Sequence, residues 1–322
     1  MIKSHRSTLT FCLLLLFCAC NSDNGKQKDK HKSQDKVEET PKERLNFDDI
    51  IGIRYTEVRR RFSNGLSFNE IGFQQEPSWI IEFKSSDTVL AYSPVKLKML
   101  PFFLMYDHGD VYNFAKEYFR IKKVTKDSLV FQRLQVVKME IDKGIKSDVN
   151  MIFYADSYIK NTLKTTAAKL QQPKKADTAY IKKLTEISNA DPANPDKAFA
   201  GREPVKFEPL SPIIKVEKKS TVDEFNGRTE AFDYLFPKYR IEIKKAYQDF
   251  AYDMKVVVDA KGKMHLISFY NSLEELKESR KKIIKSIIDI YLQNLLNVTP
   301  GMTLGIPHSS EINLIVVRKQ TG

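Results

Sequence analysis

The sequence lacks the local motifs that mark common hydrolases, phosphate-binding proteins and zinc proteases. It has no Gly-x-Ser-x-Gly turn, no Gly-rich loop ending in Gly-Lys-Ser/Thr and no His-Glu-x-x-His pair. No apolar run reaches the roughly 20 residues that a helix needs to cross a bilayer core. We therefore predict a non-enzymatic protein with no cofactor and no transmembrane helix.

Two segments do contain residue types used in catalysis or metal binding. His308-Ser309-Ser310-Glu311 has the residues of a hydrolase site, but neighbours in sequence do not form a triad by adjacency. Asp107-His108-Gly109-Asp110 has three side chains that bind hard metals, and the same residues also make a β-turn, with Gly109 at positive φ. We favour a loop and a turn, so no catalytic residue and no metal ligand is predicted.

Cysteine is scarce and confined to one end of the chain, at Cys12, Cys18 and Cys20. Residues 1–19 have the three parts of a secretory signal, with Lys3 and Arg6 before an apolar stretch and Ala19 before the cut. The Phe17-Cys18-Ala19-Cys20 segment resembles the end of a bacterial lipoprotein signal peptide. The resemblance implies that residues 1–19 are a signal peptide and that Cys20 is lipidated. The remaining chain would then have no free thiol, no disulfide and no thiolate metal site.

The residue after Cys20 bears on location. Asn21 stands where an aspartate retains Gram-negative lipoproteins in the inner membrane. The resemblance therefore implies the outer membrane, on its periplasmic side or at the cell surface. Acyl chains contribute ~0.8 kcal/mol per buried methylene, so a multiply acylated Cys20 would anchor the protein stably.

Residues 20–46 are rich in charges of both signs and nearly free of apolar side chains. They cannot bury a core, and we predict a disordered tether. The chain carries a net charge of +12, which falls to 12 − 2 = +10 when Lys3 and Arg6 leave with the signal. Export and a lipid anchor argue against a nucleic-acid partner, so the basic balance indicates a solubilising surface or a face near an anionic membrane.

Residues 47–155 have the pattern of an antiparallel β domain. Strand signals, including a hairpin around residues 125–128, lie at residues 78–83, 88–92, 118–124, 129–136 and 149–154. Their spacing predicts a sandwich or small barrel, which loosely resembles lipocalin-type domains. That resemblance implies an apolar ligand in a barrel mouth lined by Trp79, Phe83, Phe119 and Phe131. The alternative is that these aromatic side chains fill a closed core.

One basic cluster, Arg59-Arg60-Arg61, lies within this domain. Guanidinium groups bind phosphates, including lipid A headgroups. The alternative is an exposed strand or turn edge.

Residues 156–231 are predicted to hold helices and a proline-containing linker. Helical spacing covers residues 157–170 and 176–189, and residues 201–212 contain three prolines. We expect the helices to form a helical hairpin or a brace against one domain, followed by an extended segment.

Residues 232–322 predict a C-terminal ββαβ module, which makes the fold class α+β. Strands at residues 250–258 and 263–270 flank a turn, a helix runs from about residue 272 to 296, and a strand follows at residues 311–317. The first hairpin, Val256-Val257-Val258-Asp259-Ala260-Lys261-Gly262-Lys263-Met264, and the position of the last strand resemble the C-terminal domain of TonB-type proteins. The resemblance implies a protein partner in the cell envelope that adds a strand to a sheet edge. The chain departs from that family in having a lipid anchor where TonB-type proteins have a transmembrane helix, which argues against coupling to an inner-membrane motor.

Overall fold

The computed structural model describes residues 44–138, 140–142, 147–219, 230–244, 249–270 and 273–318. The predicted signal peptide, Cys20 and all but the last three residues of the predicted tether lie outside these ranges. The described chain is mostly β-structure with few helices.

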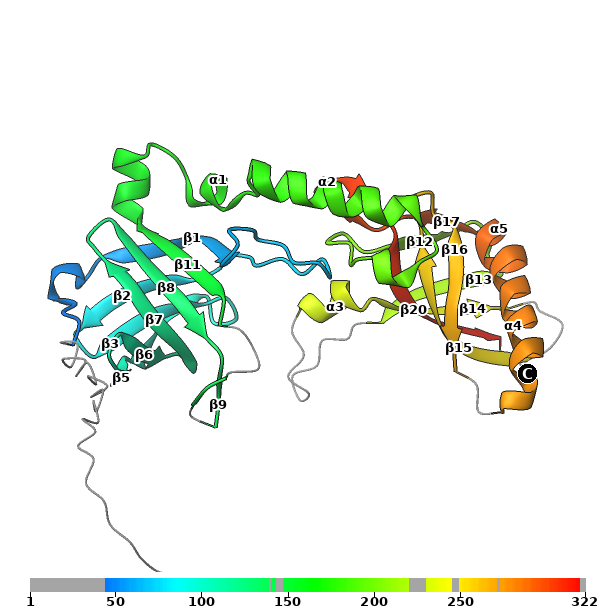
Figure 1. The fold of residues 1–322 in the computed structure, drawn as a ribbon, viewed down its shortest axis with the longest axis horizontal. Coiled ribbons are helices and arrows are strands. Elements are labelled where there is room, and N and C mark those ends of the chain that lie inside the picture. Colours follow the sequence, from blue (N-terminus) through cyan, green and yellow to red (C-terminus); the bar gives the residue numbers. More distant parts are fainter. Residues whose placement is uncertain are drawn as a thin grey trace, which may run out of the picture. The chain divides into compact units, whose positions relative to one another are not determined.

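The first module is a nine-stranded antiparallel sheet that curls into a nearly closed barrel (Figure 1). The strand order is β4-β3-β2-β1-β11-β8-β7-β6-β5. The strands are β1 (Arg54–Phe62), β2 (Ile80–Ser85), β3 (Thr88–Ser93), β4 (Lys98–Phe103), β5 (Met105–His108), β6 (Val111–Phe114), β7 (Glu117–Val124), β8 (Ser128–Leu134) and β11 (Val149–Ala155). The short strands β9 (Val136–Val137) and β10 (Glu140–Ile141) pair only with each other among the described residues. The predicted antiparallel domain and its β7–β8 hairpin are confirmed.

Alternating apolar residues place one face of a strand in the core of the sheet, as β11 shows. In β11, Val149, Met151, Phe153 and Ala155 are buried while the residues between them are half-buried. Leu45, near the end of the predicted tether, and Phe47, just after it, also join this core. Leu45 donates its backbone N–H to the Tyr112 hydroxyl at 2.9 Å, and Phe47, which precedes the short helix η1 (Asp48–Ile50), stacks on Phe83.

The predicted helical hairpin is only half present. Its first half consists of η2 (Tyr158–Thr162) and α1 (Ala167–Gln171), which are short and separate. Its second half is the continuous helix α2 (Lys175–Ala190), which is followed by the turn η3 (Pro195–Lys197). Lys164 adopts a positive φ of 47° between η2 and α1, which breaks the first stretch.

The C-terminal module is a five-stranded sheet with strand order β13-β14-β20-β15-β16. Its strands are β13 (Ile214–Lys219), β14 (Lys238–Ile243), β15 (Phe250–Val258), β16 (Met264–Phe269) and β20 (Ser310–Arg318). The smaller elements are β12 (Lys206–Pro209), α3 (Ala231–Leu235), η4 (Glu274–Leu276), β17 (Leu296–Thr299), β18 (Met302–Thr303) and β19 (Ile306–Pro307). The module is thus larger than the ββαβ unit predicted from the sequence.

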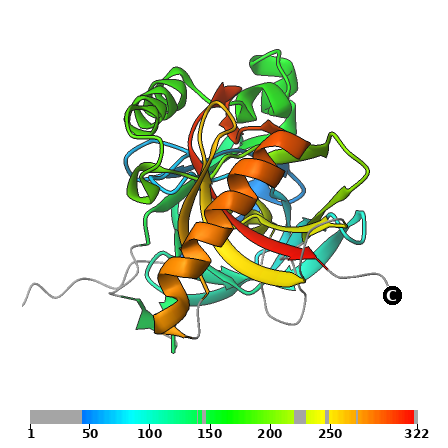
Figure 2. The ribbon, with the colours of Figure 1, turned by 90° about the vertical axis from the view of Figure 1, so that its right-hand side faces the viewer.

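A long helical segment covers one face of this sheet (Figure 2). It comprises α4 (Lys277–Ser286), the π-helical segment η5 (Ile287–Leu292) and α5 (Gln293–Leu295). Ile284, Ile288 and Leu292 are buried against sheet residues that include Val256 and Leu314. None of the described helices combines the length and apolarity that a membrane-crossing helix needs.

The stretch predicted as an extended linker belongs to this module. Val205, Phe207 and Ile214 are buried in its core, and β12 pairs with β17. The Tyr239 hydroxyl of β14 donates a hydrogen bond to the Val205 carbonyl. The segment that contains these prolines is therefore extended, but it remains part of the folded module.

The last strand lies in the middle of the sheet. β20 pairs in parallel with β14 and antiparallel with β15. The edges of the sheet are therefore β13 and β16, and no described strand pairs with the outer side of either.

Candidate functional site

The outer edge of β16 is the surface best suited to accept another strand. β16 has the sequence Met-His-Leu-Ile-Ser-Phe, without lysine, arginine, aspartate or glutamate. The opposite edge strand, β13, carries three lysines, at Lys215, Lys218 and Lys219. Charged side chains, lysine above all, protect sheet edges from unwanted pairing. β16 lacks charged side chains, and its one irregularity is a register shift against β15 between Leu266 and Ser268.

The hydrogen bonds of Met264 show which backbone groups face outward. The Met264 N–H donates to Oε1 of Gln293 at 3.0 Å and is therefore not bonded to β15. Alternate residues of an antiparallel strand direct their N–H and C=O groups to the same side. The backbone groups of Leu266, two residues on, are thus turned to the open edge. Gln293 also donates from Nε2 to the Gly262 carbonyl at 3.1 Å, which ties the hairpin to the helical segment.

A shallow groove runs beside this edge. It has a volume of about 290 Å³ and is lined by β16 residues, by the helical segment and by Ala193 from the turn after α2. Lys285, Ile288 and Asp289 form its helical side. Lys263, in the turn before β16, also lines the groove, so an added strand would meet the apolar Ile288, two lysines and the Asp289 carboxylate.

The turn that leads into β16 is fixed by Asp259. This carboxylate accepts hydrogen bonds from the N–H groups of Lys261 and Lys263 and lies 3.0 Å from Nε2 of His265. Burial disfavours the charged carboxylate, but the hydrogen bonds from His265, Lys263 and Lys261 outweigh burial and hold the pKa of Asp259 below its usual value. Gly262 completes the turn at φ +80°. His265, on β16, is therefore a hydrogen-bond partner of Asp259.

The hydrolase-like segment is buried. His308, Ser309 and Ser310 are almost fully inaccessible, and Glu311 forms a salt bridge with Lys255 on the neighbouring strand. The His308 ring stacks on Phe199 with centroids 3.5 Å apart, and its Nε2 lies 3.1 Å from the Thr303 hydroxyl. Burial lowers the pKa of His308 to about 4. The segment packs the module internally and offers no solvent-accessible nucleophile.

The Asp107–Asp110 segment is a hairpin turn, as favoured from the sequence. Gly109 has φ +54°, and Nδ1 of His108 lies 2.5 Å from Oδ2 of Asp107. Arg120 donates from Nε to Asp110 at 3.1 Å. Within the described ranges, no group of three or more His, Cys, Asp or Glu side chains is placed to hold a metal ion.

Two arginines of the basic cluster are internal partners of buried carboxylates. Arg60 binds Glu57 through two hydrogen bonds of 2.8 and 2.6 Å, and Arg61 binds Asp177 of α2 at 2.9 Å. The side chains of Arg60 and Arg61 are each 13% exposed. Neither sequence-based interpretation of these two residues, a phosphate site or an exposed edge, is correct.

The aromatic side chains proposed to line a barrel mouth pack on one another. The rings of Trp79 and Phe119 lie 5.5 Å apart, and those of Phe119 and Phe131 lie 5.7 Å apart. Phe83 stacks on Phe47 at 4.9 Å. These rings fill the barrel core, which was the alternative weighed from the sequence.

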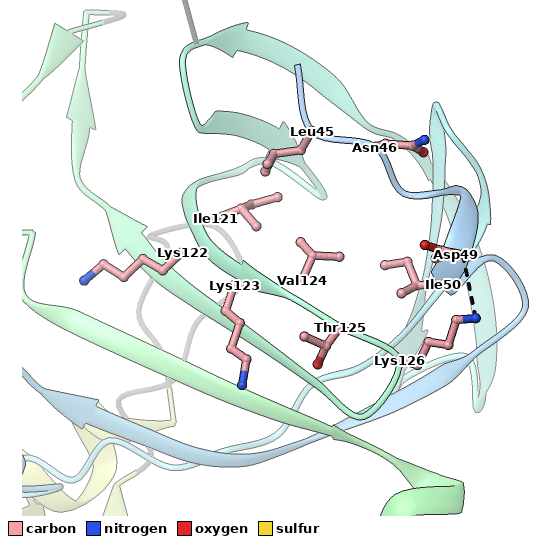
Figure 3. A pocket seen from close by; sticks show the side chains of 10 residues that line it. All are labelled: Leu45, Asn46, Asp49, Ile50, Ile121, Lys122, Lys123, Val124, Thr125 and Lys126. Atoms are coloured by element: carbon pink, nitrogen blue, oxygen red, sulfur yellow. Dashed lines mark ion pairs between the residues drawn. The ribbon is translucent and has the colours of Figure 1, made fainter. Parts of the chain in front are cut away.

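A hollow of about 300 Å³ lies on the barrel surface between residues 45–50 and 121–126 (Figure 3). Leu45, Ile50, Ile121 and Val124 give it an apolar wall, and three lysines surround it. Lys122 donates to Asn150 at 2.9 Å and Lys126 pairs with Asp49 at 3.7 Å. The ammonium groups of Lys122 and Lys123 point away from the hollow (Figure 3). The lysines therefore do not converge on a ligand.

The β16 edge carried no local sequence signal, because the position of a strand at a sheet edge depends on distant pairing. Cys20, the one functional residue predicted from the sequence, lies outside the described residues. The chain matches no protein-family model, and a comparison with curated proteins gives no match.

Proposed function

We propose that this protein is a lipid-anchored, non-enzymatic binding or assembly protein of the cell envelope, held in the outer membrane by acylated Cys20. The observation that supports the binding role is the uncharged outer edge of β16, with its outward backbone groups beside a groove. A partner strand would pair with the outward N–H and C=O groups of Leu266, beyond Met264, whose N–H is bonded to Gln293, as in other cases of strand addition. Side-chain specificity would come from the groove.

This role is tested by blocking the edge with proline. In intact cells, a photo-crosslinking residue at exposed Ser268 should trap a protein partner. Leu266→Pro should abolish the crosslink, because it removes an N–H that faces outward and leaves the ladder to β15 intact. The matched control is Lys218→Pro on β13, where the N–H also faces outward. Thermal melts show whether both variants fold, and a crosslink that survives Leu266→Pro would rule out strand addition at β16.

The anchor makes a separate prediction. Cys20→Ser should shift the protein from the membrane fraction to the soluble fraction, because the acyl chains supply the stable attachment. Mass spectrometry of the purified protein should show acylation at Cys20. Cys18→Ala is the control and should leave both results unchanged. An unmodified Cys20 in the native protein would overturn the anchor.

A further inference from the structure

The edge strand β4 presents an apolar face outward. In β4, Met99, Pro101 and Phe103 lie on the outer side, and the exposed Leu97 before the strand and Met105 after it lie next to them in the chain. Near Phe103 the intervening residues face inward. Phe102 packs against the aromatic core, and Leu104 is buried. Leu97 is 75% exposed, Phe103 77% and Met105 57%. We call this surface the β4 face.

The neighbouring strand extends the β4 face. On β3, Tyr92 lies opposite Met99 and Leu90 lies opposite Pro101. Tyr92 is 38% exposed, and β4 is the last strand of the sheet order on this side. Large contiguous apolar surfaces on soluble domains mark interaction sites.

The charges around the β4 face indicate what covers it. Residues 88–106 contain Lys96 and Lys98, whereas the nearby acidic residues are Glu82, which lies opposite Leu90 and pairs with Arg54, and Asp87 and Asp107, which flank this stretch. Val95, 91% exposed, lies at the turn beside Lys96. Apolar side chains interleaved with lysines match an interface of acyl chains and anionic headgroups. A second copy of the chain would place the same lysines against each other.

The tether is a poor candidate to cover the β4 face. Residues 21–43 are strongly polar, and Val37 is their only aliphatic side chain apart from a proline. Their six lysines are balanced by six aspartates and glutamates, so they offer no net charge to complement Lys96 and Lys98.

The chain enters the described structure beside the β4 face. The Arg44 guanidinium lies 5.7 Å from the centroid of the Tyr106 ring, and Tyr106 follows Met105 directly. If Cys20 is anchored, the 23 residues 21–43 keep the β4 face within about 80 Å of the bilayer, which is the reach of a fully extended chain of that length. A site linked in this way binds at an effective concentration of up to about a millimolar, so a weak contact suffices.

We infer that the β4 face docks on the surface of the membrane that holds the anchor, with its apolar side chains at the headgroup boundary and Lys96 and Lys98 against anionic lipids. This inference rests on the proposed anchor at Cys20. It adds an orientation, because docking by β4 fixes which side of the barrel faces the bilayer.

The test places a fluorophore at the tip of the β4 face. The lipidated protein carrying Val95→Cys is labelled with an environment-sensitive dye and reconstituted in vesicles of phosphatidylethanolamine and phosphatidylglycerol with brominated acyl chains. The brominated lipids should lower the emission about threefold relative to unbrominated vesicles, because the tip lies at the interface. The control Asn161→Cys, on the exposed turn η2, should show no quenching. Phe103→Ser together with Met105→Ser should abolish the quenching at Val95.

Flotation of the vesicles separates this inference from the anchor. A labelled protein that does not float with vesicles contradicts the anchor. A protein that floats while its Val95 dye stays unquenched by brominated lipid contradicts docking by the β4 face. A dye that is shielded from aqueous iodide yet unquenched by brominated lipid would show that a protein, such as a second copy, covers the face, which also overturns the inference.

Discussion

Replacing Asp177 with alanine is expected to lower the free energy of unfolding by about 3–5 kcal/mol, the cost of leaving a buried charge unpaired. The Asp177 side chain is fully buried and accepts hydrogen bonds from Arg61 and from the N–H groups of Ser67 and Lys174. Burial opposes its charged form, but the hydrogen bonds from Ser67, Lys174 and Arg61 outweigh burial, so the pKa of Asp177 lies below its usual value. The substitution also removes the carboxylate at the third position of α2 that accepts the N–H of the N-cap residue Lys174, and it leaves the Arg61 guanidinium without a carboxylate.

Urea unfolding measures this effect. Trp79 is the only tryptophan, and it lies in the barrel that supplies Arg61, so its fluorescence reports the relevant unfolding. Asp191→Ala is the matched control, since Asp191 lies just beyond the other end of α2 and bonds Asn194 and Lys197 at the surface. We expect the control to cost less than about 1 kcal/mol. An equal loss of unfolding free energy in both variants would show that the buried ion pair with Arg61 contributes no more stability than the surface contacts of Asp191.

The second large effect is a loss of stability on acidification that depends on His308. The neutral ring is surrounded by Phe199, Thr303, Ser309 and Ser310, none of which carries a charge. The folded-state pKa of about 4 lies below the usual histidine value near 6.5, so the unfolded chain binds the proton first. Stability is therefore fully present above pH 6.5 and falls as pH drops toward 4, by roughly 3 kcal/mol in all.

Urea midpoints measured from pH 7.5 to 4.5 test this dependence. His308→Gln should be less stable at neutral pH but should lose most of the slope between pH 6.5 and 4.5. The control His108→Gln, on the exposed Asp107–Asp110 turn, should keep the slope of the parent protein. If His308→Gln keeps the parent's slope of stability against pH, that slope arises from other titrating groups.

The parts of the fold that follow from local pattern agree with the sequence-based predictions. The β7–β8 and β15–β16 hairpins are set by neighbouring alternation and by turn residues such as Gly262, all within a few positions. The central position of β20 and its parallel pairing with β14 depend on residues 75 positions apart. No short-range pattern encodes that pairing, so the predicted module was smaller than the real one.

Two other differences have simple physical causes. The prolines after residue 201 indicated an extended chain, and β12 is extended, but the burial of Val205 and Phe207 makes it part of a core. Three consecutive arginines indicated a charged surface because their carboxylate partners could not be identified from sequence. Glu57 lies three residues from Arg60, while Asp177 lies 116 residues from Arg61. The β16 edge was not singled out because an edge is defined by the absence of a neighbour.

The central position of β20 has a consequence for the order in which the protein can be made. The sheet cannot close until residues 310–318 have been synthesised, because β20 alone joins the β13–β14 pair to the β15–β16 hairpin. Before that moment the two hairpins have no shared strand, and the helical segment has only part of its sheet to cover. If the chain is exported in an unfolded state, as the proposed anchor at Cys20 requires, this arrangement keeps its C-terminal module open until residue 310 has been made.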